Sequence, residues 1–224
     1  MSKITYIILV FILVGLNSCN LFYDIDTTNV SVVSTKPVIQ VLGDEIQSIK
    51  VGGTYQEEGC IVSVTADSTD YPYEYIGAPD VNTAGFYIVT YTAVNGFGWK
   101  SRAFRSILVH EGNSGYSDDI AGNYESGIIE DLKKRSSISK YDVDGFWYIS
   151  DGYGQLGTKL PIIFADKGDG INYGIVPNDI PDFGLVTGTA VRNSLMNSFT
   201  FSLRIEMLDG SVLNQSFIWK LKLN

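Results

Sequence analysis

Residues 86–94 read FYIVTYTAV, and this stretch decides the fold class. In an extended chain, Phe86 and Ile88 point to one face, while Tyr87 and Val89 point to the other. Aromatic and β-branched side chains favour strands, because they pack well on a pleated surface. The stretch therefore predicts a β-strand of a small all-β domain.

Runs of the same kind lie on both sides of this strand, and glycines or polar residues separate them. They cover residues 37–43, 47–53, 60–66 and 103–110. Several short strands joined by tight turns are typical of a small β-sandwich. No run has a sustained period of 3.6 residues, so we expect few helices. Residues 37–110 therefore predict a small antiparallel sandwich.

Strand-like runs continue from residue 121 to the end of the sequence. Residues 198–208 place Phe199 and Phe201 on one face, with polar side chains between them. Asp209 and Gly210 follow, which is a strong hairpin signal. We interpret residues 120–224 as a second antiparallel β-domain, either a meander or a partly closed barrel. Within it, the segment EDLKKRSSISK (residues 130–140) predicts one helical turn or a polar loop.

The composition is that of a globular, acidic protein. The chain has 224 residues, of which 45% are hydrophobic and 18% are charged, and its formal net charge is −9. Removal of a leader that contains Lys3 leaves 15 basic and 25 acidic side chains, about −10. An acidic surface repels phosphate backbones, so we do not expect nucleic acid as a partner.

The N-terminus has the pattern of an export signal. After Lys3, residues 4–16 carry no charge and would span about 20 Å as a helix. The hydrocarbon core of a bilayer needs about 30 Å, so the stretch fits a signal-peptide core rather than a membrane span. It ends in LNSC (residues 16–19), which resembles the bacterial lipobox. The resemblance implies that residues 1–18 are removed and that Cys19 carries lipid; an ordinary secretory signal is the alternative.

Only two cysteines are present. If Cys19 is lipidated, Cys60 has no partner for an intramolecular disulfide. Cys60 lies between apolar residues in GCIVSVTA, so we expect a small buried side chain.

Composition changes divide the chain into five segments. After the leader (1–18), residues 19–36 are rich in Thr, Ser and Asn and read as a tether. The sandwich (37–110) follows, then a Gly/Ser/Asp linker (111–119) and the C-terminal β-domain (120–224).

Residues of the first domain resemble the immunoglobulin-like domains of Bacteroidota surface lipoproteins. Those domains carry G-x-x-Y-x-E-x-G, matched by residues 52–59, and an alternating strand segment that ends in A-x-N. Matches to the strand segment and to the last strand are Gly85, Tyr87, Val89, Tyr91, Ala93, Asn95, Arg105, Ile107 and Val109. The resemblance implies an immunoglobulin-like β-sandwich and says almost nothing about a ligand.

The second domain resembles the C-terminal domain of an uncharacterised family of two-domain surface lipoproteins. Residues 149–152 (ISDG) and Gly154 fit its Y-x-I/L-S-D-x-x-G segment, whereas the usual double Gly and Tyr pair are reduced to Gly154-Gln155. Many relatives accompany outer-membrane glycan-uptake systems. The resemblance therefore implies an outer-membrane lipoprotein, exposed at the cell surface, that binds a polysaccharide or an outer-membrane protein complex.

The sequence offers little for catalysis, metals or cofactors. His110 is the only histidine, and Cys60 lies in another strand. The acidic segments at residues 142–145 and 166–172 do not have the EF-hand spacing, so acidic turns are the favoured interpretation. We expect no metal, no cofactor and no enzymatic activity.

The best candidate for ligand binding is GFWYISDGYG, residues 145–154. Trp147 and Tyr153 offer aromatic faces for sugar rings, and Asp151 offers hydrogen bonds to hydroxyl groups. The alternative is that these aromatics fill the core, since Trp147 shares a strand face with Ile149. Rival aromatic loops are residues 70–75 and the pair Phe97 and Trp99.

Three functional hypotheses follow. The preferred one is a lipid-anchored envelope protein that binds a glycan or partner without catalysis. The second is a structural or assembly subunit that binds another envelope protein. The third, a hydrolase, is least favoured, because acidic pairs exist in any acidic chain.

Overall fold

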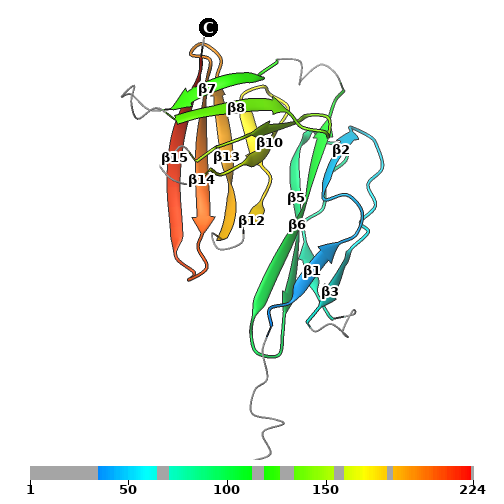
Figure 1. Ribbon diagram of the computed structural model, residues 1–224. Coiled ribbons are helices and arrows are strands. Elements are labelled where there is room, and N and C mark those ends of the chain that lie inside the picture. Colours follow the sequence, from blue (N-terminus) through cyan, green and yellow to red (C-terminus); the bar gives the residue numbers. More distant parts are fainter. Residues whose placement is uncertain are drawn as a thin grey trace, which may run out of the picture. The chain divides into compact units, whose positions relative to one another are not determined.

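The computed structural model describes residues 35–64, 71–112, 119–126, 134–153, 159–180 and 184–222. Throughout these ranges the regular structure is β only, as predicted (Figure 1). Accordingly, the described residues contain no helix that is long and apolar enough to cross a membrane. The signal peptide, Cys19 and most of the tether lie outside the described residues.

The first half of the chain forms two small sheets. Its strands are β1 (Val38–Val41), β2 (Ile46–Lys50), β3 (Cys60–Ser63), β4 (Glu74–Ile76), β5 (Gly85–Val94) and β6 (Lys100–His110). Strands β1 and β3 pair with each other, and the second sheet has the order β2-β6-β5-β4. The stretch at residues 86–94 lies in β5, which pairs with β6 along its whole length. The long hairpin β5–β6 therefore forms the centre of the four-stranded sheet in this half.

One pairing differs from the predicted antiparallel sandwich. Strand β2 runs parallel to β6, with Ile46 opposite Ser106 and Lys50 opposite His110. Alternating residues predict a strand but not the direction of its partner, because both directions place side chains on the same two faces. The parallel pair was therefore beyond what the pattern could predict.

The interior of this half is built from alternate residues of β5 and β6. Val89, Tyr91, Ile107 and Val109 are fully buried there. Cys60 packs into the same cluster and is a free, buried cysteine, as expected. Burial raises the pKa of its thiol, and the nearby Glu57 charge raises it further. Cys60 therefore behaves as a small core residue.

A buried ion pair explains the G-x-x-Y-x-E-x-G segment. The side chain of Arg105 is fully buried, and its Nη1 lies 3.2 Å from Oε1 of Glu57. The hydroxyl groups of Tyr91 and Tyr55 donate hydrogen bonds to the Glu57 carboxylate, and the Gly59 backbone N–H donates a third. The segment thus supplies the counter-charge for Arg105 of the last strand.

The second half of the chain closes into a barrel. Its strands are β7 (Gly122–Ser126), β8 (Lys134–Lys140), β9 (Phe146–Ile149), β10 (Ile162–Asp166), β11 (Asn172–Ile175), β12 (Asn178–Ile180), β13 (Gly184–Asn193), β14 (Ser198–Glu206) and β15 (Val212–Leu221). The sheet order is β11-β10-β9-β8-β7-β15-β14-β13-β12, and β11 also pairs with β13. That extra pairing, with Asn172 opposite Val191, closes eight strands into a ring. Every pair is antiparallel, so the predicted second β-domain is a closed barrel rather than a meander.

Strand β14 follows the predicted alternation. Phe199, Phe201, Leu203 and Ile205 all point into the barrel core and are at most 2% exposed. The predicted hairpin is also present, because Met207 N–H donates to the Ser211 carbonyl across the turn. These local patterns were therefore sufficient to predict the C-terminal hairpin.

The prediction for residues 130–140 was wrong over its described part. Residues 134–140 form strand β8, with Ser136 and Ile138 buried and their neighbours more exposed. A serine at a core-facing position hides the alternation, because the pattern then reads as polar. Lys134 and Arg135 belong to this strand, and Lys133 lies outside the described residues.

A third cluster joins the two halves. Leu108 of β6 packs with Phe146 of β9 and Ala165 of β10, and all three are buried. The rings of Phe86 and Phe146 lie edge to face at 6.2 Å between centroids. Residues 36–224 accordingly form one compact unit. The predicted boundaries at residues 110 and 120 stay predictions, since residues 113–118 lie outside the described residues.

Candidate functional site

Strand β9 has buried side chains on both faces. Trp147, 5% exposed, and Ile149 point into the barrel core. Phe146 points the other way, toward the cluster with Leu108. The Nζ of Lys140 lies 6.0 Å from the centroid of the Trp147 ring. Trp147 therefore has the surroundings of a core residue, the alternative that the sequence left open.

Asp151 organises the turn after β9. Asp151 is buried, with only 4% of its surface exposed. One carboxylate oxygen accepts hydrogen bonds from the backbone N–H groups of Tyr153 (3.0 Å) and Leu160 (3.2 Å). The Asp151 N–H donates to Oγ of Ser136 at 2.8 Å. These bonds shape the loop, and they engage the carboxylate that we expected to meet sugar hydroxyls.

Tyr153 is half-buried and packs against the barrel. Its ring meets that of Phe217 edge to face, with centroids 5.1 Å apart. The structure thus brings Tyr153 next to Asp151 but places Trp147 inside the barrel. Ligand binding by these three residues stays a prediction, and their described contacts are those of packing and turn formation. Gly154 and Gln155 lie outside the described residues.

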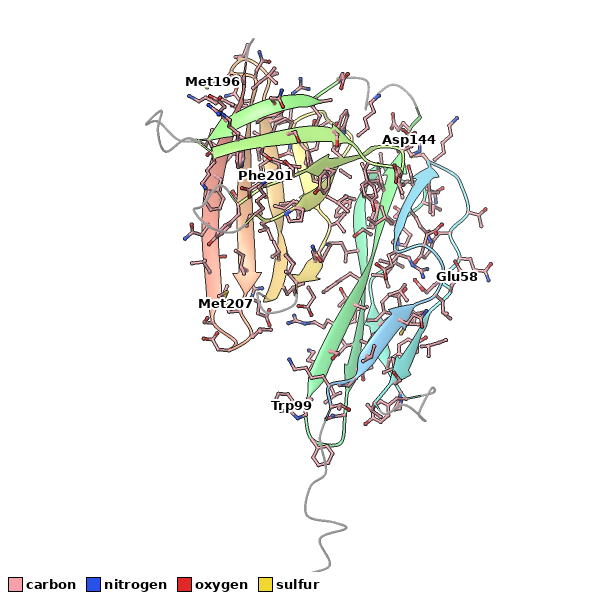
Figure 2. The ribbon with its side chains drawn as sticks, viewed as in Figure 1. Glu58, Trp99, Asp144, Met196, Phe201 and Met207 are labelled. Atoms are coloured by element: carbon pink, nitrogen blue, oxygen red, sulfur yellow. The ribbon has the colours of Figure 1, made fainter. Side chains whose placement is uncertain are left out.

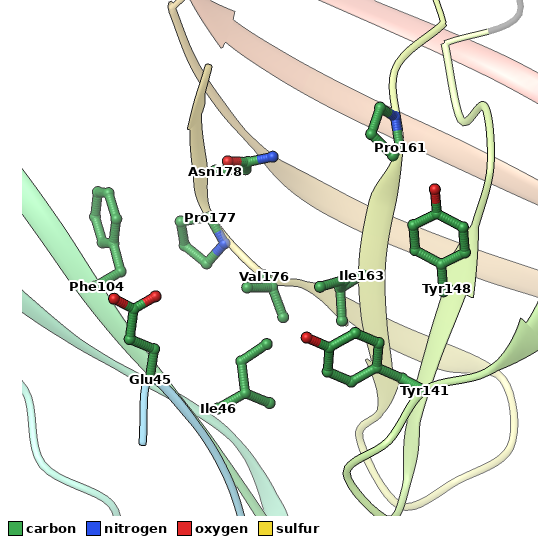
Figure 3. A pocket seen from close by; sticks show the side chains of 10 residues that line it. All are labelled: Glu45, Ile46, Phe104, Tyr141, Tyr148, Pro161, Ile163, Val176, Pro177 and Asn178. Atoms are coloured by element: carbon green, nitrogen blue, oxygen red, sulfur yellow. The ribbon is translucent and has the colours of Figure 1, made fainter. Parts of the chain in front are cut away.

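A pocket of about 280 Å³ opens on the other side of β9 (Figure 3). We call it the tyrosine pocket. Its lining comes from the sandwich and from the barrel, and three of its side chains are aromatic. The lining residues are Glu45, Ile46, Phe104, Tyr141, Tyr148, Pro161, Ile163, Val176, Pro177 and Asn178.

The barrel wall of the tyrosine pocket rests on neighbouring strands. Tyr148 of β9 stands opposite Ile163 of β10, so their side chains share one face of the sheet. The Ile163 carbonyl accepts a hydrogen bond from Val176 N–H at 2.9 Å, which fixes the segment before Pro177. Tyr141 is held by its N–H, which donates to the Phe146 carbonyl at 2.9 Å.

The sandwich wall is formed by β2 and β6. The Glu45 carbonyl accepts a hydrogen bond from Ser106 N–H at 2.8 Å, which holds Glu45 at the start of β2. Ile46 packs against the third cluster, as do Tyr141, Ile163 and Val176. The floor of the pocket is therefore the same apolar cluster that joins the two halves.

The lining combines flat apolar surfaces with a few hydrogen-bonding groups. Phe104, Tyr141 and Tyr148 supply rings, while Glu45 and Asn178 supply a carboxylate and an amide (Figure 3). Sugars present apolar C–H faces and hydroxyl groups, which suit such a lining. The volume of about 280 Å³ lies just below the usual range of ligand pockets, about 300 to 1,000 Å³. A pocket of this size suits a small ligand or one unit of a longer ligand.

A second, more polar groove of about 420 Å³ lies over β7 and β8. It is lined by Asn123, Tyr124, Glu125, Arg135, Ser136, Ser137, Ser150 and Lys222. Its charged groups already bond to one another: Glu125 accepts from Lys222 (3.2 Å) and Arg135 (3.4 Å). The Tyr124 ring is buried and offers no exposed face. This groove is the weaker candidate.

The acidic segment at residues 166–172 is a turn stabilised by its own carboxylates. Oδ1 of Asp166 accepts hydrogen bonds from the N–H groups of Gly168, Asp169 and Gly170. Burial nevertheless raises the pKa of Asp166, against the effect of these bonds. Among the described residues, no three His, Cys, Asp or Glu side chains gather as a metal site would require.

Sequence reasoning selected the region of strand β9, and the structure places the tyrosine pocket on the face opposite to the one that carries Trp147. Tyr148 lies one residue from Trp147, and alternation alone does not tell which face of β9 meets a pocket. Glu45 and Phe104 carry no signal in the sequence, because they reach the site only through the packing of the two halves. The one available hint was the aromatic density of residues 146–148.

Comparison with solved structures finds a distant likeness. No family model matches the chain, and no curated protein matches its sequence. Among solved structures, the chain is similar to a crystal structure of the lipoprotein BT2262 from Bacteroides thetaiotaomicron. The match has 18% sequence identity and a TM-score of 0.34, and it covers 82% of this chain and 99% of that chain. A likeness of this size carries no conclusion about function, which has to rest on the chain itself.

Proposed function

We propose that the chain is a lipid-anchored protein of the cell envelope that binds a glycan in the tyrosine pocket and does not cleave it. We place it at the outer membrane, exposed to the exterior, as an accessory of an uptake system. The observation that carries the binding role is the tyrosine pocket, in which three rings surround a space edged by a carboxylate and an amide.

The anchor is supported by the N-terminal sequence. An uncharged stretch too short to span a bilayer runs directly into LNSC at residues 16–19. Acylation of a cysteine with more than one chain holds a protein firmly at a membrane, at about 0.8 kcal/mol per buried CH₂ group.

The chemistry of the pocket favours a neutral, hydroxyl-rich ligand. Among the described lining residues, Glu45 is the one charged side chain. An acidic sugar would meet this carboxylate without a compensating cation, which is unfavourable. Hydroxyl groups can donate to Glu45 and bond to Asn178 while the ring packs on Tyr148.

Binding without cleavage fits the same lining. Glycoside hydrolysis normally uses two carboxyl groups, about 5 to 9.5 Å apart, on either side of the bond. Glu45 is the only carboxylate among the described residues of the tyrosine pocket. We therefore expect no bond cleavage when the purified protein is incubated with glycans that it binds.

The role of the pocket can be tested by replacing one ring. Tyr148→Ala should weaken binding of neutral glycans about tenfold, because loss of a stacking face costs about 1 to 1.5 kcal/mol. Binding to a panel of polysaccharides and oligosaccharides, followed by calorimetry with the best ligand, measures the effect. Ile218→Ala is the control, since Ile218 is 53% exposed, lies outside the pocket and belongs to none of the candidate aromatic loops.

Two results would contradict the proposal. One is equal glycan affinity of the wild type and Tyr148→Ala with unchanged melting temperatures. The other is no binding across a broad panel, together with recovery of one envelope protein by crosslinking in intact cells. The second result would favour the structural or assembly role.

The anchor has a separate test in the native host. Cys19→Ser removes the acylated thiol, so the protein should shift from the membrane to the soluble fraction after a carbonate wash. Cys60→Ser is the control for loss of a cysteine and should stay with the membrane. Membrane retention of Cys19→Ser would overturn the lipid anchor, and protease treatment of intact cells tests surface exposure.

A further inference from the structure

The β5–β6 hairpin ends in an exposed aromatic turn, residues 95–99, which we call the hairpin tip. Phe97 is 64% exposed, and Trp99 is 48% exposed. Figure 2 shows Trp99 at this end of the hairpin. Val94, directly before the turn, is also 48% exposed. Large apolar side chains gathered on one turn mark an interaction surface.

Asn95 gives the hairpin tip a defined shape. Its side chain is nearly buried, and its Oδ1 accepts hydrogen bonds from the N–H groups of Phe97 and Trp99, both at 3.0 Å. Asn95 N–H donates to the Trp99 carbonyl at 3.0 Å, and Gly98 N–H donates to the Asn95 carbonyl at 2.9 Å. Gly98 has a φ of +82°, which a glycine adopts without strain. The two rings are therefore presented by an ordered turn.

The β5–β6 hairpin carries basic but no acidic side chains in an otherwise acidic protein. Residues 81–110 contain no Asp or Glu, although the chain has 25 of them. Lys100 follows the tip directly, and Nζ of Lys36 lies 5.8 Å from the centroid of the Trp99 ring. Trp rings beside lysines are typical of the membrane–water interface, where the ring lies among headgroups and the cation meets phosphates.

Lys36 also marks where the N-terminal segment enters the compact unit. Residues 20–35 separate it from Cys19, and sixteen residues span at most about 58 Å. The chain that we propose to be lipidated therefore joins the folded part beside the exposed rings.

From these observations we propose that the hairpin tip inserts Phe97 and Trp99 into the headgroup region of the membrane that carries the lipid anchor. This inference rests on the anchor of the proposed function. The tip gives the tethered domain a second contact with the lipid surface. The occupant of the aromatic surface is thus phospholipid rather than a sugar or a protein.

The three tryptophans make the insertion measurable. Trp147 and Trp219 are at most 5% exposed, so a quencher outside the protein core reports on Trp99. The experiment uses the full, lipidated protein in vesicles of phosphatidylethanolamine and phosphatidylglycerol with bromine on the acyl carbons nearest the headgroup. Up to about one third of the total Trp emission should be lost, and acrylamide should quench Trp99 less than in detergent.

Two variants of the hairpin tip and one control variant on the barrel assign the signal. Trp99→Phe should abolish the bromine-dependent loss, whereas the exposed barrel control Ile218→Ser should keep it. Phe97→Ser should reduce the bromine-dependent loss of emission, because a small polar side chain replaces the second inserted ring. Each variant is also tested for flotation with the vesicles, which measures membrane attachment through the lipid anchor independently of the tip.

The outcomes separate the two proposals. If the protein floats with the vesicles but bromine leaves its emission unchanged, the tip does not insert, and the anchor stands. A protein that does not float contradicts the anchor and, with it, the insertion of the tip. Quenching that survives Trp99→Phe would also overturn the inference.

Discussion

At the residue scale, the most consequential group is the buried charge of Arg105. Its guanidinium is fully buried and pairs with Glu57, whose side chain is 17% exposed. Burial alone would raise the pKa of Glu57, but hydrogen bonds from Tyr55, Tyr91 and Gly59 and the Arg105 charge lower it. The same network raises the pKa of Tyr55 to about 12, first through burial and then through its bond to Glu57. The pair is therefore held in its charged form.

This network predicts a stability loss at low pH. The pKa of Glu57 is lower in the folded chain than its ordinary value of 4.5, so the folded state binds its proton more weakly. The resulting stability is fully present above about pH 4.5 and is lost as pH falls through the folded pKa. Glu57→Gln should cost about 2 kcal/mol at pH 7 and should flatten the stability profile below pH 4.5.

Urea unfolding at a series of pH values measures this effect. Glu58→Gln is the control, because Glu58 is the exposed neighbour in the same segment (Figure 2). It should leave both the stability at pH 7 and the acid profile unchanged. Equal acid sensitivity of Glu57→Gln and the wild type would show that other carboxylates whose pKa is lowered in the fold, such as Asp169, control the profile.

At the scale of elements, two glycines allow the sandwich strands and the barrel to approach. A methyl group on Gly174 of β11 would overlap the ring of Phe86 of β5. A methyl group on Gly145, just before β9, would overlap the side chain of Leu108 of β6, and Gly145 also has a φ of +82°. Close contact between these elements therefore requires glycine, which has no side chain, at positions 145 and 174.

Gly174→Ala should destabilise the protein by about 2 kcal/mol, because the Phe86 ring is packed against Phe146 and has little room to move. Gly96→Ala is the matched control, since nothing lies within 4 Å of the added group, and its effect should stay within about 0.5 kcal/mol. Urea unfolding measures both. Phe86→Leu should recover part of the loss in the Gly174→Ala background, and independent effects of the two changes would contradict the contact.

At the scale of the whole molecule, the two halves share one apolar cluster and an ion pair. Leu108, Phe146 and Ala165 are buried together, and Arg102 of β6 pairs with Glu206 of β14. The ion pair is partly exposed and contributes at most about 1 kcal/mol. Coupling between the halves therefore rests on the cluster, which is also the floor of the tyrosine pocket.

Calorimetry should show one unfolding transition for the wild type, because each half loses the cluster when the other unfolds. Phe146→Ala removes the central ring, costs about 3 to 5 kcal/mol and should split the transition into two. Phe97→Ala, which changes an exposed ring, should leave the single transition in place. Two transitions in the wild type would disprove the coupling, and a single transition in Phe146→Ala would show that the coupling does not depend on this ring.

Local patterns in the sequence were sufficient to predict the class of fold and most of the strands. The alternation at residues 86–94 and 198–206, and the turn at Asp209 and Gly210, correspond to β5, β14 and their hairpins. They succeed because side-chain alternation and turn chemistry depend on neighbouring residues only. Strand β8 was missed because a serine occupies a buried position and disguises the period.

The sequence by itself thus determined an all-β protein, a buried free Cys60 and an N-terminus that predicts a lipid anchor. Only the tertiary structure decided that β2 runs parallel to β6, that β11 closes the barrel on β13, and which face of β9 meets a pocket. The reason is physical: a period of two residues reports that a strand has two faces. It does not report which distant strand pairs with it, or which face packs against a core and which lines an opening between packed elements.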